Sequence, residues 1–171
     1  MLESMDVLDL SATARARFWS KVIRGEGAGA CWIWCGAIGS DGYGRFWLND
    51  PSEPQAQRVM RAHRYAMATV LGQDVPAGNL VTHLCDNPLC VRAEPGDAGH
   101  LFLGNHAENM AERQRRGRGN LHNEFYIPRS RAERARDARI IRAHTLEHGY
   151  SQELIDEVMR MTRPANQGML F

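Results

Sequence analysis

Lysine and long apolar runs are what the sequence most clearly lacks. No segment of the 171 residues reaches the ~18 consecutive apolar residues that a transmembrane helix needs. Residues 1–18 contain no apolar core like that of a signal peptide. We therefore expect a protein that is not exported, does not insert into a membrane and works in the cytoplasm. Its 43% hydrophobic and 24% charged residues are typical of a folded globular protein.

The basic side chains are unevenly distributed, and Lys21 is the only lysine among 21 of them. Residues 1–112 carry 9 basic and 13 acidic side chains, a balance of −4. Residues 113–142 carry 10 arginines and 3 acidic side chains, a balance of +7, and residues 143–171 contribute −2 to the net charge of +1. A basic block in a near-neutral chain is typical of a segment that binds nucleic acid. Arginine suits phosphate because its planar fork can donate to two oxygens at once.

The spacing of apolar and turn residues predicts an α+β protein. Helices are expected from an N-cap at Ser11 to Ile23 and at 58–71, 107–116, 129–147 and 152–161. Short strands are expected at 31–35, 43–48, 80–84 and 100–103, with 43–48 as the second strand of a hairpin that turns at 39–42. Because 117–128 has the composition of a linker, we expect a catalytic or binding module in 1–118 and a basic helical extension in 119–171.

The cysteines are Cys31, Cys35, Cys85 and Cys90, and in a reducing compartment they favour metal binding or burial over disulfides. Cys85 and Cys90 lie five positions apart across an Asn-Pro turn, so both sulfurs can meet at one zinc ion, and His100 could supply a third ligand. The fourth ligand would be Cys31 or Cys35. In a strand these two lie roughly 13 Å apart, which disfavours the alternative cluster of all four cysteines.

Several short motifs follow one another between residues 18 and 118. They are Cys31-Trp-x-Trp-x-Gly36, Gly42-Tyr-Gly44, Ala62-His-Arg64, His83-x-Cys85-x4-Cys90 and His100-Leu101, with Asn109 downstream. In this order they resemble the motifs of phage-type HNH endonucleases. They resemble more closely those of the His-Cys box homing endonucleases, which share the ββα-metal, or His-Me, finger.

The resemblance implies a small zinc-stapled ββα-metal finger nuclease with a basic helical C-terminal extension. It assigns a structural zinc to the set Cys31, Cys85, Cys90 and His100. It makes His83 the general base and Asn109 the ligand of a catalytic Mg²⁺. The sequence departs from the family in two places: the spacing from Cys90 to His100 is longer, and Thr82 occupies a position where many HNH enzymes carry a metal-binding Asp or His.

The implied function is metal-dependent hydrolysis of phosphodiester bonds in double-stranded DNA, which leaves a 5′-phosphate and a 3′-hydroxyl. His83 would deprotonate water, and the ion would stabilise the leaving oxygen. Arg45 or Arg64 could stabilise the transition-state charge. DNA contacts are expected from Arg113, Arg115, Arg116, Arg118, Arg131 and Arg134. A homodimer would supply a second active site for the second strand.

Other residues and functions have simpler interpretations. We expect His63 to be structural and Cys35 to be a buried thiol. The aromatic side chains are expected to pack in the core and the hairpin rather than stack on bases; they are Trp32, Trp34, Tyr43, Phe46 and Trp47.

The alternative function is a catalytically silent zinc module that binds nucleic acid through its extension. A protein-binding adaptor fits the arginine block poorly, and the turn between the last two helices lacks the pattern of a helix-turn-helix.

Overall fold

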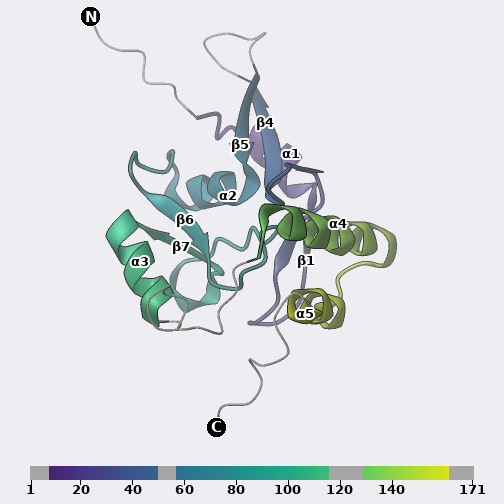
Figure 1. The fold of residues 1–171 in the computed structure, drawn as a ribbon. Coiled ribbons are helices and arrows are strands. Elements are labelled where there is room, and N and C mark those ends of the chain that lie inside the picture. The colour runs from purple at the N-terminus through teal and green to yellow at the C-terminus, as the bar shows by residue number, and fades with distance from the viewer. Residues whose placement is uncertain (1–7, 50–56, 116–128, 162–171) are drawn as a thin grey trace, which may run out of the picture.

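The structure, a computed structural model, describes residues 8–49, 57–115 and 129–161, in which small antiparallel sheets lie among helices (Figure 1). The sheets are β1 (Val22–Arg24) with β2 (Trp32–Trp34), β3 (Ala37–Ile38) with β4 (Gly44–Asn49) and β5 (Gln57–Arg61), and β6 (Leu80–His83) with β7 (Leu101–Gly104). The helices are α1 (Ala12–Trp19), α2 (Ala62–Leu71), the short η1 (Gly96–Ala98), α3 (His106–Arg115), α4 (Arg131–His148) and α5 (Gln152–Met161). This confirms the predicted α+β class. No helix among the described residues is long and apolar enough to span a membrane.

Phe18 on α1 lies at the centre of the hydrophobic core and is fully buried. Its ring stacks on Trp34 at 4.9 Å between centroids and lies 5.2 Å from Phe46 and 4.8 Å from Tyr65. Trp34 requires glycine at two neighbouring positions, because a Cβ at Gly36 or Gly44 would lie 2.3 or 2.4 Å from its ring. One buried indole thus explains Gly36 and Gly44, which belong to two different sequence motifs.

Two predicted helices are shorter than expected because their ends pair as strands. The first helix begins at its predicted cap, where Ser11 Oγ accepts from Ala14 N–H, but residues 22–24 form β1 and pair with β2. The helix predicted at 58–71 is β5 up to Arg61 and α2 thereafter, ending as expected at Gly72 with φ 70°. Val22, Ile23 and Val59 are β-branched residues that suit a pleated surface. Their pairing partners could not be recognised from local spacing.

The predicted hairpin has its turn at 39–42, but its partner strands differ from the expectation. Strand β4 pairs with the short β3 and with β5, whereas β2 pairs with β1. The expectation that Trp47 packs in the core is wrong, because its side chain lies on the outer face of β4 and is 41% exposed. Trp34 and Phe46 are buried as expected.

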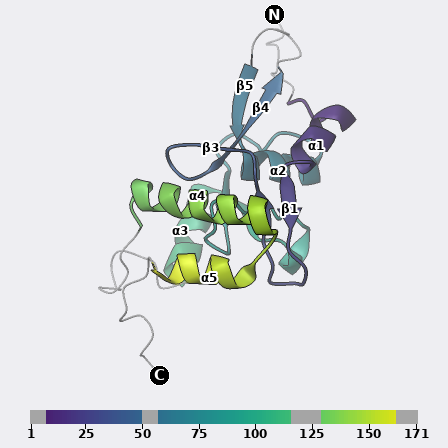
Figure 2. The ribbon, with the colours of Figure 1, turned by 90° about the vertical axis from the view of Figure 1, so that its right-hand side faces the viewer.

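Helices α4 and α5 lie side by side and pack on the rest of the protein (Figure 2). A capping box begins α4: Glu133 N–H donates to Ser130 Oγ, and Ser130 N–H donates to Glu133 Oε2. Ile141 and Ile155 belong to the same hydrophobic cluster as Phe18. The basic extension therefore shares its core with the preceding residues. The predicted linker at 117–128 lies outside the described residues.

Two neighbouring isoleucines on α4 test this packing. Ile141 is fully buried, whereas Ile140 is 43% exposed. Ile141→Ala is expected to lower the free energy of unfolding by about 2–5 kcal/mol, whereas Ile140→Ala should change it by less than about 0.5 kcal/mol. Urea unfolding followed by tryptophan fluorescence measures both. Equal effects of the two substitutions would show that α4 does not share the core.

Candidate zinc centre and nuclease site

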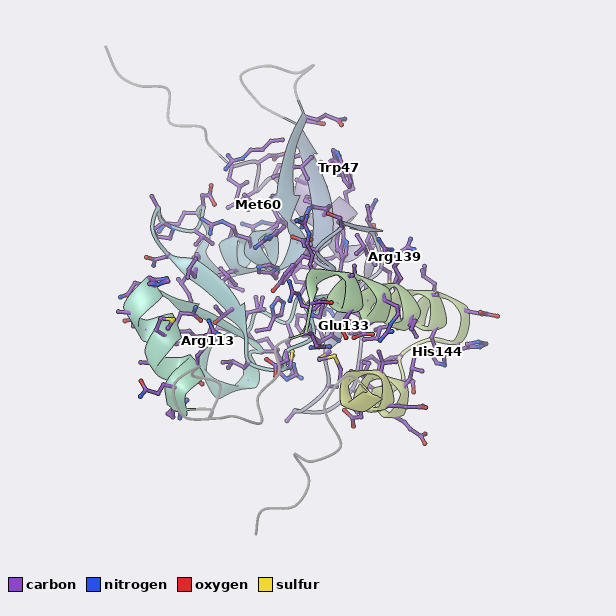
Figure 3. The ribbon with its side chains drawn as sticks, viewed as in Figure 1. Trp47, Met60, Arg113, Glu133, Arg139 and His144 are labelled. Atoms are coloured by element: carbon purple, nitrogen blue, oxygen red, sulfur yellow. The ribbon has the colours of Figure 1, made fainter. Side chains whose placement is uncertain are left out.

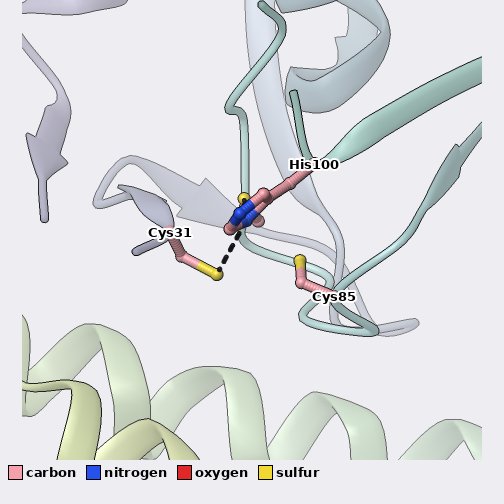
Figure 4. Close-up of side chains that lie close together, drawn as sticks. Cys31, Cys85 and His100 are labelled. Atoms are coloured by element: carbon pink, nitrogen blue, oxygen red, sulfur yellow. Dashed lines mark hydrogen bonds between the residues drawn. The ribbon is translucent and has the colours of Figure 1, made fainter. Parts of the chain in front are cut away.

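Three cysteines and one histidine meet beside the ends of β2, β6 and β7 (Figure 4). The ligand atoms of Cys31, Cys85, Cys90 and His100 all lie within 4.8 Å of one another. His100 Nδ1 is 3.6 Å from the sulfurs of both Cys31 and Cys90. In tetrahedral coordination with Zn–S near 2.3 Å and Zn–N near 2.1 Å, sulfur and nitrogen ligands lie about 3.6 Å apart. The four predicted residues therefore lie close enough together to hold one metal ion, and the two sulfur–nitrogen distances fit zinc.

Backbone pairing between β2 and residues 89–91 brings Cys31 to the other cysteines. Trp34 N–H donates to Leu89 O at 2.9 Å, Val91 N–H donates to Trp32 O at 2.8 Å, and Ile33 and Cys90 form the bridge between them. Cys31 and Cys35 lie beyond opposite ends of this strand. Only Cys31 belongs to the cluster, while Cys35 is buried with its thiol directed to Ile33 O. As strand geometry predicts, Cys31 and Cys35 do not share one site.

The longer spacing before His100 is occupied by a turn that is built around Arg92. This side chain is almost fully buried, and its Nη1 donates to the carbonyls of Gly27, Ala28 and Ala30 at 2.8–3.0 Å. His100 N–H donates in turn to Arg92 O at 2.9 Å. Arg92 thus ties the segment that precedes Cys31 to the segment that precedes His100, so the extra residues do not displace the histidine from the cluster.

The thiols of the cluster are difficult to ionise without a compensating charge. Burial, together with a hydrogen bond to Cys31, raises the pKa of Cys90 to about 12. The hydrogen bond to Cys85 is the main cause that raises the pKa of Cys31. Neighbouring buried thiolates repel one another, and a divalent cation relieves that repulsion by taking them as ligands. The donor set and its burial both fit a structural zinc ion.

Residues on either side of α4 hold the backbone around this cluster. Tyr150 Oη accepts from Cys31 N–H at 2.9 Å, and its ring packs against Gly25, where no side chain would fit. Arg129 donates to Asp86 O at 3.2 Å, within the turn between Cys85 and Cys90. Part of the basic extension therefore supports the cluster, a role that the sequence did not indicate.

His83 ends β6 next to the cluster and is half-buried. Its Nε2 lies 3.0 Å from Cys90 O. Because a carbonyl can only accept, Nε2 carries the proton of the neutral ring and Nδ1 keeps a lone pair. Burial lowers the pKa of His83 to about 4, so the ring is neutral near pH 7. The rings of His63 and Tyr43 flank it at 4.7 and 5.8 Å.

Asn109 lies in the first turn of α3, which follows β7 directly. Strands β6 and β7 pair from Leu80↔Gly104 to His83↔Leu101, and α3 packs on both, so these elements form a ββα unit. The N-cap of α3 is Asn105, whose Oδ1 accepts from Glu108 N–H at 2.9 Å. The Asn109 side chain is half-buried and makes no hydrogen bond with the described residues. It is therefore not needed as a helix cap.

The arginines near His83 differ in how they are engaged. Arg45 donates to both oxygens of Asp41 at 2.8 Å, and Arg64 donates to Val75 O and Asn79 O. Arg61, which the sequence analysis missed, stacks over Tyr43 and shares Asp41 at 3.1 Å, yet half of its side chain is exposed. It was missed because residues 58–61 were assigned to a helix. Pairing in β5 places Arg61 opposite Arg45.

The arginines predicted to contact DNA lie in different environments. Arg113 and Arg115 are on α3, where Arg115 is exposed and pairs with Glu112 at 2.5 Å. Arg131 begins α4 and donates to Ser40 Oγ at 2.6 Å. Arg134 is half-buried and donates to Arg129 O, whereas Arg116 and Arg118 lie outside the described residues.

The fold and the site together define a mixed α+β protein with a candidate zinc centre on a ββα unit. Residues 60–111, which include His83 and Asn109, match the sequence profile of the HNH endonuclease family. Protein 7.7 of Escherichia phage T7 is 31% identical over 137 residues, which cover 76% of this chain and 92% of that protein. The chain therefore belongs to the HNH endonuclease family.

A second relative covers less of the chain. Protein 2.8 of the same phage is 34% identical over 88 residues, which are 52% of each sequence. No solved structure matches the chain. Cys31, α4 and α5 lie outside the segment that matches the family profile.

Substitution of individual cysteines tests the zinc centre. The purified protein is expected to contain one zinc ion per chain, and Cys31→Ala should lose it because a tetrahedral structural site needs all four ligands. Cys35→Ala is the matched control, because Cys35 is also buried but lies outside the cluster. Elemental analysis after dialysis measures the zinc content. Loss of zinc from Cys35→Ala, or retention by Cys31→Ala, would contradict this assignment.

Proposed function

We propose that this protein is a DNA endonuclease that hydrolyses phosphodiester bonds with His83 as general base. The observation that carries the proposal is the hydrogen bond of His83 Nε2 to Cys90 O, which leaves Nδ1 with its lone pair inside an HNH family segment. In that tautomer His83 can take a proton from an attacking water molecule. The HNH family match favours DNA as the substrate, and the relatives from a phage favour action in the cytoplasm of a host cell.

A catalytic divalent ion would be held by Asn109. Its amide oxygen is free of protein hydrogen bonds in the described residues and lies on the helix of the ββα unit. One amide ligand suits Mg²⁺, which commonly keeps several water molecules in protein sites. When bound, such an ion stabilises negative charge on the leaving 3′ oxygen. Cleavage of the bond between the phosphorus atom and this 3′ oxygen leaves a 5′-phosphate and a 3′-hydroxyl.

Arg61 is the arginine that we place on the scissile phosphate. Arg45 and Arg64 stay candidates from the sequence, but Arg64 donates to two main-chain carbonyls. Arg45 donates to both oxygens of Asp41 and is mostly buried, whereas Arg61 donates to one of them and is half-exposed. Arg61 combines an exposed side chain with a position over Tyr43, whose ring neighbours His83. A guanidinium there can stabilise the charge that develops on the phosphate oxygens.

The alternative is a zinc-stabilised module that binds nucleic acid without cleaving it. Thr82, half-buried beside His83, supplies no acidic or imidazole ligand for a catalytic ion, which favours this alternative. Gel analysis distinguishes the two: an enzyme produces nicked or linear plasmid, whereas a binding module shifts intact DNA. A dimer that cuts both strands stays a prediction, which sedimentation of the protein–DNA complex would test.

Plasmid cleavage tests the role of His83. The wild-type protein is expected to nick or linearise plasmid DNA with Mg²⁺ and to lose this activity in EDTA. His83→Ala should reduce the rate by about 10²–10⁴-fold, because a positioned base contributes about that much. His148→Ala is the control, since His148 is exposed at the end of α4. Full cleavage by His83→Ala, or by the wild type in EDTA, would refute the mechanism.

Substitutions of Arg61 and Arg58, both on β5, serve as a second test variant and its control. Arg61→Ala is expected to lower the cleavage rate at saturating DNA by about 10²–10³-fold, as loss of one transition-state donor does. Arg58→Ala should leave the rate unchanged, because Arg58 lies opposite Leu48 and pairs with Asp74. Arg64→Ala should lower thermal stability instead. Single-turnover kinetics separate these effects, and an unaffected rate for Arg61→Ala would exclude it from the phosphate site.

A further inference from the structure

The Ala62-His-Arg64 motif contains a buried histidine to which the proposed chemistry gives no role. His63 is the second residue of α2, which follows β5 directly and packs on β6. Its side chain is only 4% exposed, and its Nδ1 is buried without a hydrogen-bond partner in the described part of the chain. Buried polar atoms are nearly always paired, and an unpaired one costs stability. A ligand that reaches this nitrogen would remove that cost.

The ring of His63 lies against the ring of the proposed base. The ring centroids of His63 and His83 are 4.7 Å apart, and the two rings meet edge to face. Tyr43 contacts both histidines, at 5.2 Å from His63 and 5.8 Å from His83. Arg61 lies over the same tyrosine ring at 4.7 Å. The two histidines and the arginine that we place on the scissile phosphate therefore share one aromatic neighbour.

The surroundings of the two imidazoles differ in the protonation state that they favour. Burial is the main cause that holds the pKa of His63 well below its ordinary value, and the charges of His83 and of nearby arginines act in the same direction. Burial also lowers the pKa of His83, but the hydrogen bond to Cys90 O and the charge of Asp86 favour its protonated form. Within this pair, a proton taken from water is therefore better held by His83.

We propose that His63 Nδ1 accepts a hydrogen bond from the attacking water molecule and thereby orients it for His83. His83 Nδ1 keeps a lone pair because its Nε2 donates to Cys90 O. In the same tautomer of His63, Nδ1 offers a second lone pair. One water molecule can donate to both nitrogens, and buried water commonly links polar groups in this way. At a ring separation of 4.7 Å, two hydrogen bonds of about 2.9 Å each can span the pair.

The arrangement leaves the oxygen of the water molecule ready to react. Because both of its hydrogens are donated to imidazole nitrogens, both of its lone pairs stay free to attack phosphorus. His83 takes one proton as the new bond to phosphorus forms, and His63 keeps its hydrogen bond to the other hydrogen. The bond from phosphorus to the 3′ oxygen breaks, and the leaving oxygen takes a proton from solvent. His63 accepts a hydrogen bond throughout and takes no proton itself.

This inference rests on the proposed nuclease function, and substitutions of His63 test it. His63→Phe keeps a planar ring and removes both nitrogens, whereas His63→Asn keeps a polar group close to the position of Nδ1. His63→Phe is expected to lower the single-turnover cleavage rate at saturating DNA about tenfold or more, because one hydrogen bond to the reacting water is lost. His63→Asn should retain more of the rate than His63→Phe does.

Thermal unfolding distinguishes this role from a structural one. His63→Phe removes a buried nitrogen that lacks a partner, so we expect a melting temperature equal to or above that of the wild type. His144→Phe is the matched control, because His144 Nδ1 is also buried without a partner, but α4 places it apart from β6, β7 and α3 (Figure 3). His144→Phe should leave the cleavage rate unchanged. Circular dichroism and zinc content verify that each variant is folded.

A double substitution tests whether both histidines act on the same water molecule. Residues that act as a unit are non-additive. Adding His63→Phe to His83→Ala should therefore slow cleavage by a much smaller factor than His63→Phe slows the wild type. Equal factors in the two backgrounds would show that His63 does not act on the water that His83 deprotonates, and the proposal would be wrong.

The outcomes separate this inference from the proposed function. If the wild type cleaves plasmid and His63→Phe cleaves at the same rate, the role of His63 is wrong while the nuclease stands. If His63→Phe lowers the melting temperature and His63→Asn is as slow as His63→Phe, His63 is structural and the inference is overturned. If the wild type never cleaves DNA, the proposed function itself fails, and the role of His63 fails with it.

Discussion

The arrangement of the candidate site depends on the convergence of one imidazole and three thiols, two of them buried and one half-buried. Cys31, the Cys85–Cys90 turn and His100 come from distant parts of the sequence and meet within 4.8 Å. Their spacing matches tetrahedral zinc, and their burial makes ionisation costly without a cation. His83 is attached to this cluster through Cys90 O. The orientation of the proposed base is therefore set by the same turn that supplies two cysteines of the candidate zinc centre.

The basic C-terminal segment has two physical roles. Some of its arginines donate to the body of the protein, as Arg129 does to Asp86 O and Arg142 to Cys35 O at 2.9 Å. Others face outward, such as Arg139, which makes no hydrogen bond or ion pair with the described residues (Figure 3). Charge clustering alone could not separate these roles. A guanidinium group that donates to main-chain carbonyls and one that is exposed to solvent have the same signature in a sequence.

Local sequence signals predicted the ββα unit well and the strand pairing poorly. Strands β6 and β7 and helix α3 are close to their predicted bounds, because their apolar runs end at turn residues. Residues 22–23 and 58–61 were assigned to helices because helical spacing continued into them. Each is a strand because a partner, β2 or β4, covers its backbone groups. The same misassignment hid Arg61 and the exposed position of Trp47.

The residue types and short spacings in the sequence determined the chemistry of the candidate site. Cys90 follows Cys85 by five positions and precedes His100 by ten. His83 lies two positions before Cys85, and Asn109 lies on the next helix. The spacings also excluded Cys35 as a partner of Cys31 on one ion, since an extended strand separates the two. Only the tertiary structure decided how much of each arginine side chain is exposed and which face of the hairpin is open. Those properties depend on contacts between segments far apart in the chain, and local sequence patterns do not encode which segments will meet.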